Sequence, residues 1–288
     1  MEHLPVQLKI RNRQSHKGTY GSAYLFAGSE GMMGAALLSA RSCMRSGLGL
    51  LTVHTAGCGY DIMQMGIPEA KCEPDTCSKC ITTISVPQGI KSVGIGPGIG
   101  QSIDTANAIY DFLVKEKTEK HRLVLDADAL NILAKNPEWF AMLPDQTILT
   151  PHPGEWKRLK EGIDKYKEKQ QSVGAECNLP RVIIVFKDAY TRVVDINLST
   201  GEEFASWTNT DHGHSGMAVG GSGDTLTGII LSLLAQDYAP MDAACLGVFI
   251  HSLAADIALE GQSEESWLPS DLIDSLGKAF RLLSQSQK

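Results

Sequence analysis

Long hydrophobic runs and blocks of basic residues are both missing from this chain of 288 residues. No uninterrupted apolar run reaches the 18 or so residues that a membrane-spanning helix needs, so we expect no membrane partner. The segment 1–17 is polar and lacks the apolar stretch of a secretory signal, which predicts a cytoplasmic location. Acidic residues outnumber basic ones by 33 to 26, and the resulting net charge of −7 argues against a nucleic-acid partner.

Cysteine is too scattered to form a disulfide framework. The chain has seven cysteines, an odd number, and reduced thiols are expected. Three of them, Cys72, Cys77 and Cys80, fall within nine residues and offer thiolate ligands for zinc. Structural zinc needs four ligands, however, and no second Cys-x-x-Cys or suitably spaced histidine lies nearby. The pattern therefore favours a solvent-facing loop with incidental thiols over a metal site.

Segments rich in β-formers alternate with apolar patterns of helical spacing along the whole chain. This alternation predicts an α/β fold with a mostly parallel central sheet covered by helices on both faces. No repeat or Pro/Ser-rich linker divides the sequence, so we predict a single domain over 1–288. We expect strands at 22–27, 48–55, 81–85, 91–95, 121–125, 147–150, 181–186, 192–196 and 204–208, and helices at 34–47, 103–115, 155–171, 225–235, 243–259 and 271–283.

The run GGSGD, from Gly220 to Asp224, stands directly before an apolar helical pattern. Its three glycines let the backbone turn tightly and aim successive N–H groups at one point. Because a helix N-terminus attracts anions, a phosphate fits there. Asp224 places a carboxylate beside this anion hole, which suggests a general base for a hydroxyl that attacks a phosphoryl group. An equally open interpretation makes Asp224 a helix N-cap and the glycines a plain turn.

Other polar residues follow the expected strands. Asp126, Asp128 and Asn131 come after 121–125, at the edge where open α/β sheets place ligands, although loops also favour these residue types. His152 stands between two prolines that hold its backbone extended, and both a structural and a functional role stay open. Lys187 ends a buried strand, where a lysine can meet phosphate or ribose but is also commonplace.

Two further patterns carry weak signals. The glycine cluster GIGPGIG over 94–100 lacks the third glycine of a dinucleotide-binding fingerprint. His212 and His214 lie just before the GGSGD turn, but two histidines alone indicate a metal only weakly.

Taken together, these motifs resemble the ADP-dependent NAD(P)H-hydrate dehydratases, which have the ribokinase-like fold. The similarity covers roughly 15–260 and rests on motifs in matching order: Ser15–Gly21 (SHKGTYG), Gly31–Gly47, Ile95–Gly98 (IGPG), Asp126–Leu130 (DADAL), Leu149–Glu155 (LTPHPGE) and Gly220–Asp224 (GGSGD). The last motif alone indicates only the superfamily, whereas SHKGTYG with TPHPGE is specific to this branch. The resemblance implies a three-layer α/β/α fold and a homo-oligomer, possibly a tetramer.

The resemblance also implies a repair reaction. The S form of NADH or NADPH hydrate is dehydrated with ADP, or with ATP in eukaryotic relatives, in the presence of Mg²⁺, giving AMP and phosphate. Asp224 would remove the proton from the hydrate's hydroxyl. The implied substrate contacts are Ala35, Gly98, His152 and Asp224; the implied nucleotide contacts are Lys187, Asp188, Ala189, Tyr190, Thr191 and Gly223; and the anion hole is Gly220, Gly221, Ser222 and Gly223.

The chain departs from the family pattern at two places. Asp188 stands where glycine is usual, which puts a carboxylate near the nucleotide, and Thr210–Ser215 (TDHGHS) replaces the usual Asn-x-Thr-Gly-Asn-x.

Some members carry a fused hydrate epimerase domain, which is not seen here, so we expect a separate epimerase in the same pathway. Two alternatives stay open: a ribokinase-like kinase of a small alcohol such as a vitamin precursor, and a catalytically silent nucleotide-binding protein.

Overall fold

The computed structural model describes residues 4–119 and 121–287. Nine strands in these residues form one sheet in the order β3-β2-β1-β4-β5-β6-β7-β8-β9. The sheet is parallel from β3 to β7, and β8 and β9 continue it antiparallel. The strands are β1 (Ser22–Phe26), β2 (Leu50–Thr55), β3 (Lys71–Pro74), β4 (Ser92–Ile95), β5 (Arg122–Leu125), β6 (Ile148–Leu149), β7 (Arg181–Phe186), β8 (Arg192–Asn197) and β9 (Glu203–Thr208).

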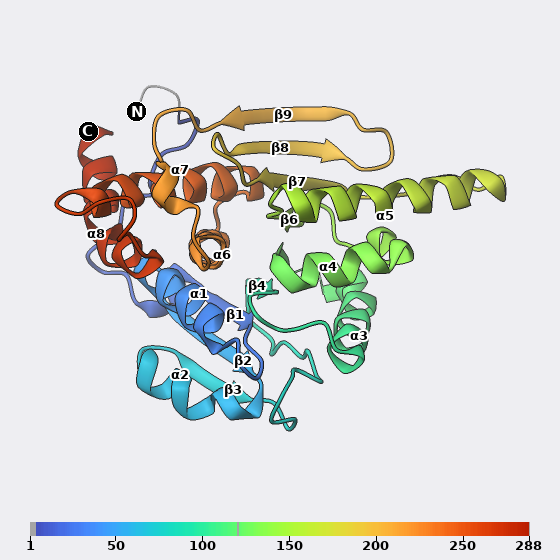
Figure 1. Cartoon of the computed structure of the whole chain (residues 1–288), viewed down its shortest axis with the longest axis horizontal. Coiled ribbons are helices and arrows are strands. Elements are labelled where there is room, and N and C mark those ends of the chain that lie inside the picture. The colour runs from blue at the N-terminus through green and yellow to red at the C-terminus, as the bar shows by residue number, and fades with distance from the viewer. Residues whose placement is uncertain (1–3, 120, 288) are drawn as a thin grey trace.

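Helices cover both faces of the sheet (Figure 1). One hydrophobic core lies between the sheet and α1, α6, α7 and α8, and a second lies between the sheet and α3, α4 and α5. Strand β7 is fully buried over Val182–Val185, because both of its faces are covered. The α-helices are α1 (Met33–Arg45), α2 (Tyr60–Gly66), α3 (Ile103–Glu119), α4 (Ala127–Lys135), α5 (Pro153–Ser172), α6 (Ser222–Ala235), α7 (Pro240–Leu259) and α8 (Pro269–Ser286).

The predicted three-layer α/β/α architecture with a mostly parallel sheet is confirmed, but the expected strand at 81–85 is wrong. That segment is irregular, and its Ile81 and Ile84 are buried by packing rather than by strand pairing. The edge of the sheet is formed instead by β3, which pairs with β2, and the short helix α2 precedes it. Neither was predicted, because β3 is only four residues long and mostly exposed, so it shows no apolar alternation.

Helix α7 is the one helix in the described residues that is long and apolar enough to cross a membrane. However, 83% of its apolar window is buried inside the protein, where α7 packs against α6 and α8. An all-round apolar helix is what the middle of a large core requires. Asp242 and Asp256 interrupt its apolar sequence, which is why no unbroken hydrophobic run marks it.

The position of α6 is set by close contact with α1. Gly228 faces the α1 backbone, and a methyl group at this position would lie 2.1 Å from both Ser39 O and Ser42 Oγ. Only glycine allows the two helices this approach. The N-terminal part of α6 lies at the end of β5, where Thr227 Oγ1 donates to Asp126 Oδ2.

Candidate functional site

A cleft of about 920 Å³ opens where β5, β6 and β7 end. This is the edge at which parallel α/β sheets bind ligands. The structure brings most of the predicted site residues to its walls: His152, Lys187, Asp188, Ala189, Tyr190, Thr191, Gly221, Ser222, Gly223 and Asp224. Gly220, Ala35 and Gly98 do not line it.

The glycine turn at the start of α6 has the geometry that the sequence suggested. Gly221 is left-handed, with φ of 98°, and a methyl group on it would lie 2.5 Å from Leu38 Cδ1. Gly221 is also the N-cap of α6, so the interpretation of Asp224 as the N-cap is wrong: Asp224 is the third helical residue, and no side chain caps the helix. Of the first-turn N–H groups, Ser222 N donates to Val219 O at 3.4 Å, whereas those of Gly223 and Asp224 have no partner among the described residues and stay available to an anion.

Two side chains from neighbouring helices hold this turn in place. The buried His251 of α7 lies with Nε2 3.0 Å from Ser222 O and 3.1 Å from Thr225 Oγ1. Burial lowers the pKa of His251 to about 4, so the ring is neutral and its Nε2–H donates to Ser222 O. From α1, Ser39 Oγ donates to the backbone carbonyl of Asp224 at 3.0 Å. The sequence placed His251 on a helix but gave no signal of this contact.

The Asp224 carboxylate accepts no hydrogen bond from the residues that the structure describes. Burial, and next the negative charge of Asp126, raise its pKa from 3.8 to about 6, while Lys187 opposes the shift. A carboxylate with this pKa is ionised at neutral pH yet basic enough to take a proton. Its position and charge suit a general base.

Asp126 and Lys187 form an ion pair beside the glycine turn. Lys187 Nζ lies 2.7 Å from Asp126 Oδ1, and Thr227 Oγ1 of α6 donates to Asp126 Oδ2 at 2.6 Å. A methyl group on Gly223 would lie 3.0 Å from Lys187 Nζ, so the ammonium group stands next to the helix N-terminus. Asp126 also lines the cleft. Its position at the end of a predicted strand was the sequence signal for its place in the site.

Asp128 and Asn131, which also follow β5, make structural contacts. Asp128 and Asn131 lie in α4 rather than in a loop; Asp128 accepts from Gly100 N at 2.9 Å and Asn131 from Arg158 Nε at 2.9 Å. Gly96 has φ of 139°, and a methyl group there would lie 1.8 Å from the backbone oxygen of Asp126. The glycine cluster therefore permits a close backbone approach that fixes Asp126.

Gly98 and Ala35 contact each other outside the cleft lining. Gly98 has φ of 61° and is buried, and a methyl group on it would lie 3.0 Å from the Ala35 methyl. Gly98 follows β4 and belongs to the glycine cluster that packs on Asp126. Gly98 and Ala35 therefore lie at the same edge of the sheet as Asp126. Gly220 is exposed, and a methyl group there would meet none of the described residues within 4 Å.

His152 has a structural role that the sequence had left open. It is the N-cap of α5, and its Nδ1 accepts from Gly154 N at 3.0 Å and from Glu155 N at 3.4 Å. Burial, then the charge of Lys187, lower the pKa of His152. Because Nδ1 accepts these two bonds, the ring proton lies on Nε2, and His152 caps the helix while it lines the cleft.

The segment after β7 forms one wall of the cleft. Asp188, the departure from the family pattern, uses Oδ1 to accept from Ala189 N at 2.8 Å. Its carboxylate is thus engaged in the turn itself. Tyr190 is 68% exposed, which leaves its ring open to a flat ligand.

His212 and His214, which also line the cleft, are each bonded to α7. His212 Nδ1 lies 2.8 Å from Asp256 Oδ2, and His214 Nε2 lies 3.2 Å from Ala255 O. In the described residues no three metal-ligating side chains form a group that could hold an ion, at the histidines or at Cys72, Cys77 and Cys80.

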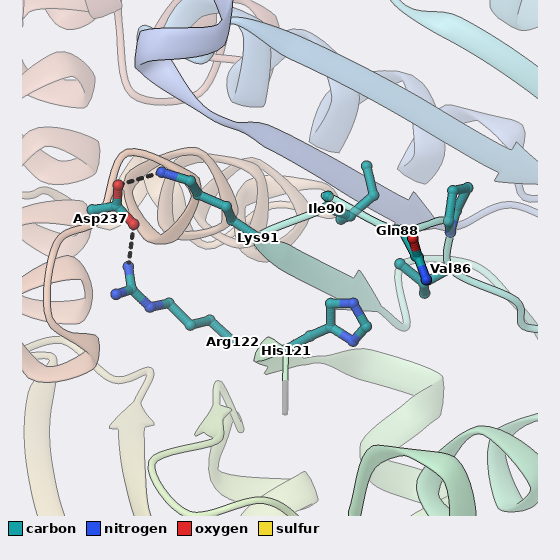
Figure 2. Close-up of a pocket in the computed structure, with 9 residues that line it drawn as sticks. Val86, Gln88, Ile90, Lys91, His121, Arg122 and Asp237 are labelled. Carbon is teal, nitrogen blue, oxygen red and sulfur yellow. Dashed lines mark hydrogen bonds and ion pairs between the residues drawn. The ribbon is translucent and has the colours of Figure 1, made fainter. Parts of the chain in front are cut away.

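A second hollow, of about 660 Å³, lies at the opposite edge, where β4 and β5 begin. Figure 2 shows Asp237 between Lys91 and Arg122, with ion pairs to both. Arg122 Nη1 also donates to the backbone oxygen of Leu234, at the end of α6. Both cations are held by Asp237, and Arg122 also caps the C-terminus of α6, so these side chains are engaged in structural contacts and this hollow is not the candidate site.

Comparison with known proteins covers nearly the whole chain. A family model described as NAD(P)H-hydrate dehydratase matches residues 23–278. The ADP-dependent (S)-NAD(P)H-hydrate dehydratase of Bacillus subtilis is 32% identical over 282 residues, covering 97% of this chain and 96% of that protein. The bifunctional NAD(P)H-hydrate repair enzyme Nnr of Coxiella burnetii is 36% identical over 276 residues, which span 93% of this chain and 52% of that protein. The chain thus spans about half the length of this bifunctional relative.

A solved structure is similar over almost the same range. It is the ADP/ATP-dependent NAD(P)H-hydrate dehydratase of Bacillus subtilis, co-crystallized with ATP/Mg²⁺. The TM-score is 0.74 at 30% sequence identity, and the superposition covers 98% of this chain and 96% of the other.

Proposed function

The chain belongs to the NAD(P)H-hydrate dehydratase family, and on that premise we propose that it dehydrates the S form of NADH or NADPH hydrate at the expense of ADP. The observation that carries the proposal is Asp224: an unpaired carboxylate with a pKa of about 6, at a helix N-terminus and beside Lys187. A base, an anion site and a cation within one cleft are what transfer of a phosphoryl group to a hydroxyl needs.

In the proposed reaction, Asp224 accepts the proton of the hydrate's hydroxyl as that oxygen attacks the terminal phosphorus of ADP. The bond between this phosphorus and the bridging oxygen breaks, and AMP leaves with the electron pair. The phosphorylated hydrate then loses phosphate and a ring proton, which restores the double bond of the reduced nicotinamide. The free N–H groups of Gly223 and Asp224 stabilise the negative charge on the transferred group.

The remaining residues bind and orient the two substrates. We assign the AMP portion to Lys187–Thr191 and Gly223, and the hydrate to the side of Asp224, with His152 donating from Nε2. Ala35 on α1 and Gly98 in the adjoining glycine loop lie outside the cleft lining, and we assign them to the far side of the hydrate site. Support for this division comes from the cleft, whose lining includes Lys187–Thr191, His152 and Asp224.

The charges of the site fit Mg²⁺ as a cofactor. The negative charges of Asp126, Asp128 and Glu155 all act on Asp224, against the single cation Lys187 among the groups that shift its pKa. Mg²⁺ prefers oxygen ligands and commonly binds through one or two carboxylates together with substrate phosphates. Asp126 and Glu155, which both line the cleft, would hold it together with the phosphates of the nucleotide, directly or through water, and it would neutralise phosphate charge that Lys187 cannot balance alone.

The test uses NADH hydrate with ADP and Mg²⁺, followed both by phosphate release and by absorbance of the reduced nicotinamide. We expect both signals to rise together. Asp224→Asn should lower the rate about 10²- to 10⁴-fold while the variant still binds ADP. Asp274→Asn, at an exposed position on α8, is the matched control and should retain full activity.

Two outcomes would contradict the proposal. Accumulation of a stable phosphorylated product with ADP or ATP and a small alcohol, without nicotinamide recovery, would identify a kinase instead. Binding of ADP with no turnover of hydrate or alcohol, while a family member assayed in parallel is active, would identify a silent nucleotide-binding protein.

We further propose that the chain works as a single domain in a cytoplasmic homo-oligomer, alongside an epimerase that interconverts the two hydrate forms. The one continuous sheet supports the single domain. The bifunctional repair enzyme among the relatives supports a linked second activity. Light scattering of the purified protein measures the subunit number directly.

A further inference from the structure

The loop that follows β3 holds two cysteines in direct contact. Cys77 and Cys80 are free thiols, and their Sγ atoms lie 3.4 Å apart. A disulfide bond is ~2.05 Å long and joins residues whose Cβ atoms are already close, so only a small side-chain movement separates this pair from a bond. Both side chains are partly exposed, which lets a small oxidant reach them.

The loop has its shape before any bond forms. The buried Asp75 accepts hydrogen bonds from Cys77 N at 2.9 Å and from Thr82 N at 2.8 Å, so it clamps the two ends of the loop together. On the outer side, Lys79 O accepts from Glu30 N at 2.9 Å and Cys77 O from Gly57 N at 2.8 Å. The two sulfurs are therefore kept together by the fold and do not depend on oxidation to meet.

The two thiols differ in their electrostatic surroundings. Backbone N–H groups of Lys79 and Cys80 point at the Cys77 sulfur and lower its pKa, whereas burial raises the pKa of Cys80. Elsewhere, burial raises the pKa of Cys72 to about 11 and that of Cys245 to about 12. Because the thiolate is the reactive form, Cys77 is set apart as the attacking group and Cys80 as its partner.

We propose that Cys77 and Cys80 are a reversible disulfide site, oxidised by low-molecular-weight disulfides such as oxidised glutathione. The Cys77 thiolate attacks one sulfur of the oxidant, forms a mixed disulfide and expels one thiol. Cys80 then attacks Cys77 Sγ, the mixed disulfide breaks, and the second thiol leaves. The two protein protons end on the two released thiols, so one disulfide is consumed for each one formed.

Mapping of the oxidised protein tests the site. The folded, full-length chain is equilibrated with mixtures of oxidised and reduced glutathione, alkylated in denaturant and weighed intact. We expect five alkylated cysteines in place of seven, and a return to seven after treatment with a dithiol. Trypsin cuts after Lys79, between the two cysteines, so the bond should join peptide 72–79 to peptide 80–91.

Cys72 lies on the same tryptic peptide as Cys77 and needs its own control. Cys72→Ser should keep the linked peptides, whereas Cys77→Ser should lose them; fragment ions that separate position 72 from position 77 answer the same question in the unmutated protein. Cys80→Ser should trap glutathione on Cys77. A link through Cys72 or Cys58, glutathione adducts without a cross-link, or seven alkylated cysteines under oxidising conditions would each overturn the proposal.

Discussion

Burial of Asp224, and next the charge of Asp126, set the pH dependence of the proposed reaction. Asp224 must be ionised to accept a proton, so activity rises with pH through the pKa of Asp224, which burial and Asp126 raise to about 6. With that pKa, kcat/KM at pH 5 should be about tenfold below its value at pH 7. An aspartate at its ordinary pKa of 3.8 would show almost no loss over the same range.

Replacing Asp126 by asparagine removes the nearby negative charge and keeps a side chain of the same shape for Lys187 and Thr227. Both the lost charge and the freed lysine favour the ionised form of Asp224, so its pKa should fall by about half to one unit. The loss of kcat/KM between pH 7 and pH 5 should then shrink from about tenfold to about two- to fourfold. The absolute rate can fall as well, but the ratio between the two pH values reports the pKa.

Phosphate release is the appropriate assay, because reduced nicotinamides decompose in acid. Asp274→Asn on α8 serves as the control and should keep the pH profile of the unmutated enzyme, and circular dichroism at both pH values checks that each variant is folded. A flat profile in the unmutated enzyme, or an acidic limb that stays in place or moves upward in a folded Asp126→Asn protein, would refute the assignment of Asp224 as the base.

Three further changes have clear expected outcomes. Lys187→Met should move the acidic limb of the pH profile to higher pH, because Lys187 lowers the pKa of Asp224. The same change should raise the KM for ADP roughly ten- to hundredfold, because a charge-assisted contact is lost. Steady-state kinetics measure both effects. Gly228→Ala should destabilise the fold by about 1–3 kcal/mol or more in urea unfolding, since the new methyl group would meet Ser39 O at 2.1 Å. Gly277→Ala, on α8 where the new methyl group would meet none of the described residues within 4 Å, should instead stabilise the fold by up to about 1 kcal/mol.

The sequence alone determined the layer architecture and most of the cleft. Alternation of buried apolar strands with amphipathic helices allows few other folds, because each covered strand must be apolar on both faces, as β7 is. The GGSGD turn and Lys187 could likewise be found, since glycine and charge at strand and helix ends follow from local backbone geometry.

What only the tertiary structure decided were the contacts between segments far apart in the chain. The pKa of Asp224 depends on Asp126, 98 positions earlier, and its turn is held by His251 from another helix. The edge strand β3 was hidden because an exposed strand leaves no apolar pattern. Local sequence limits which backbone shapes are available, but burial and the charges that surround a side chain are set only when distant elements pack against it.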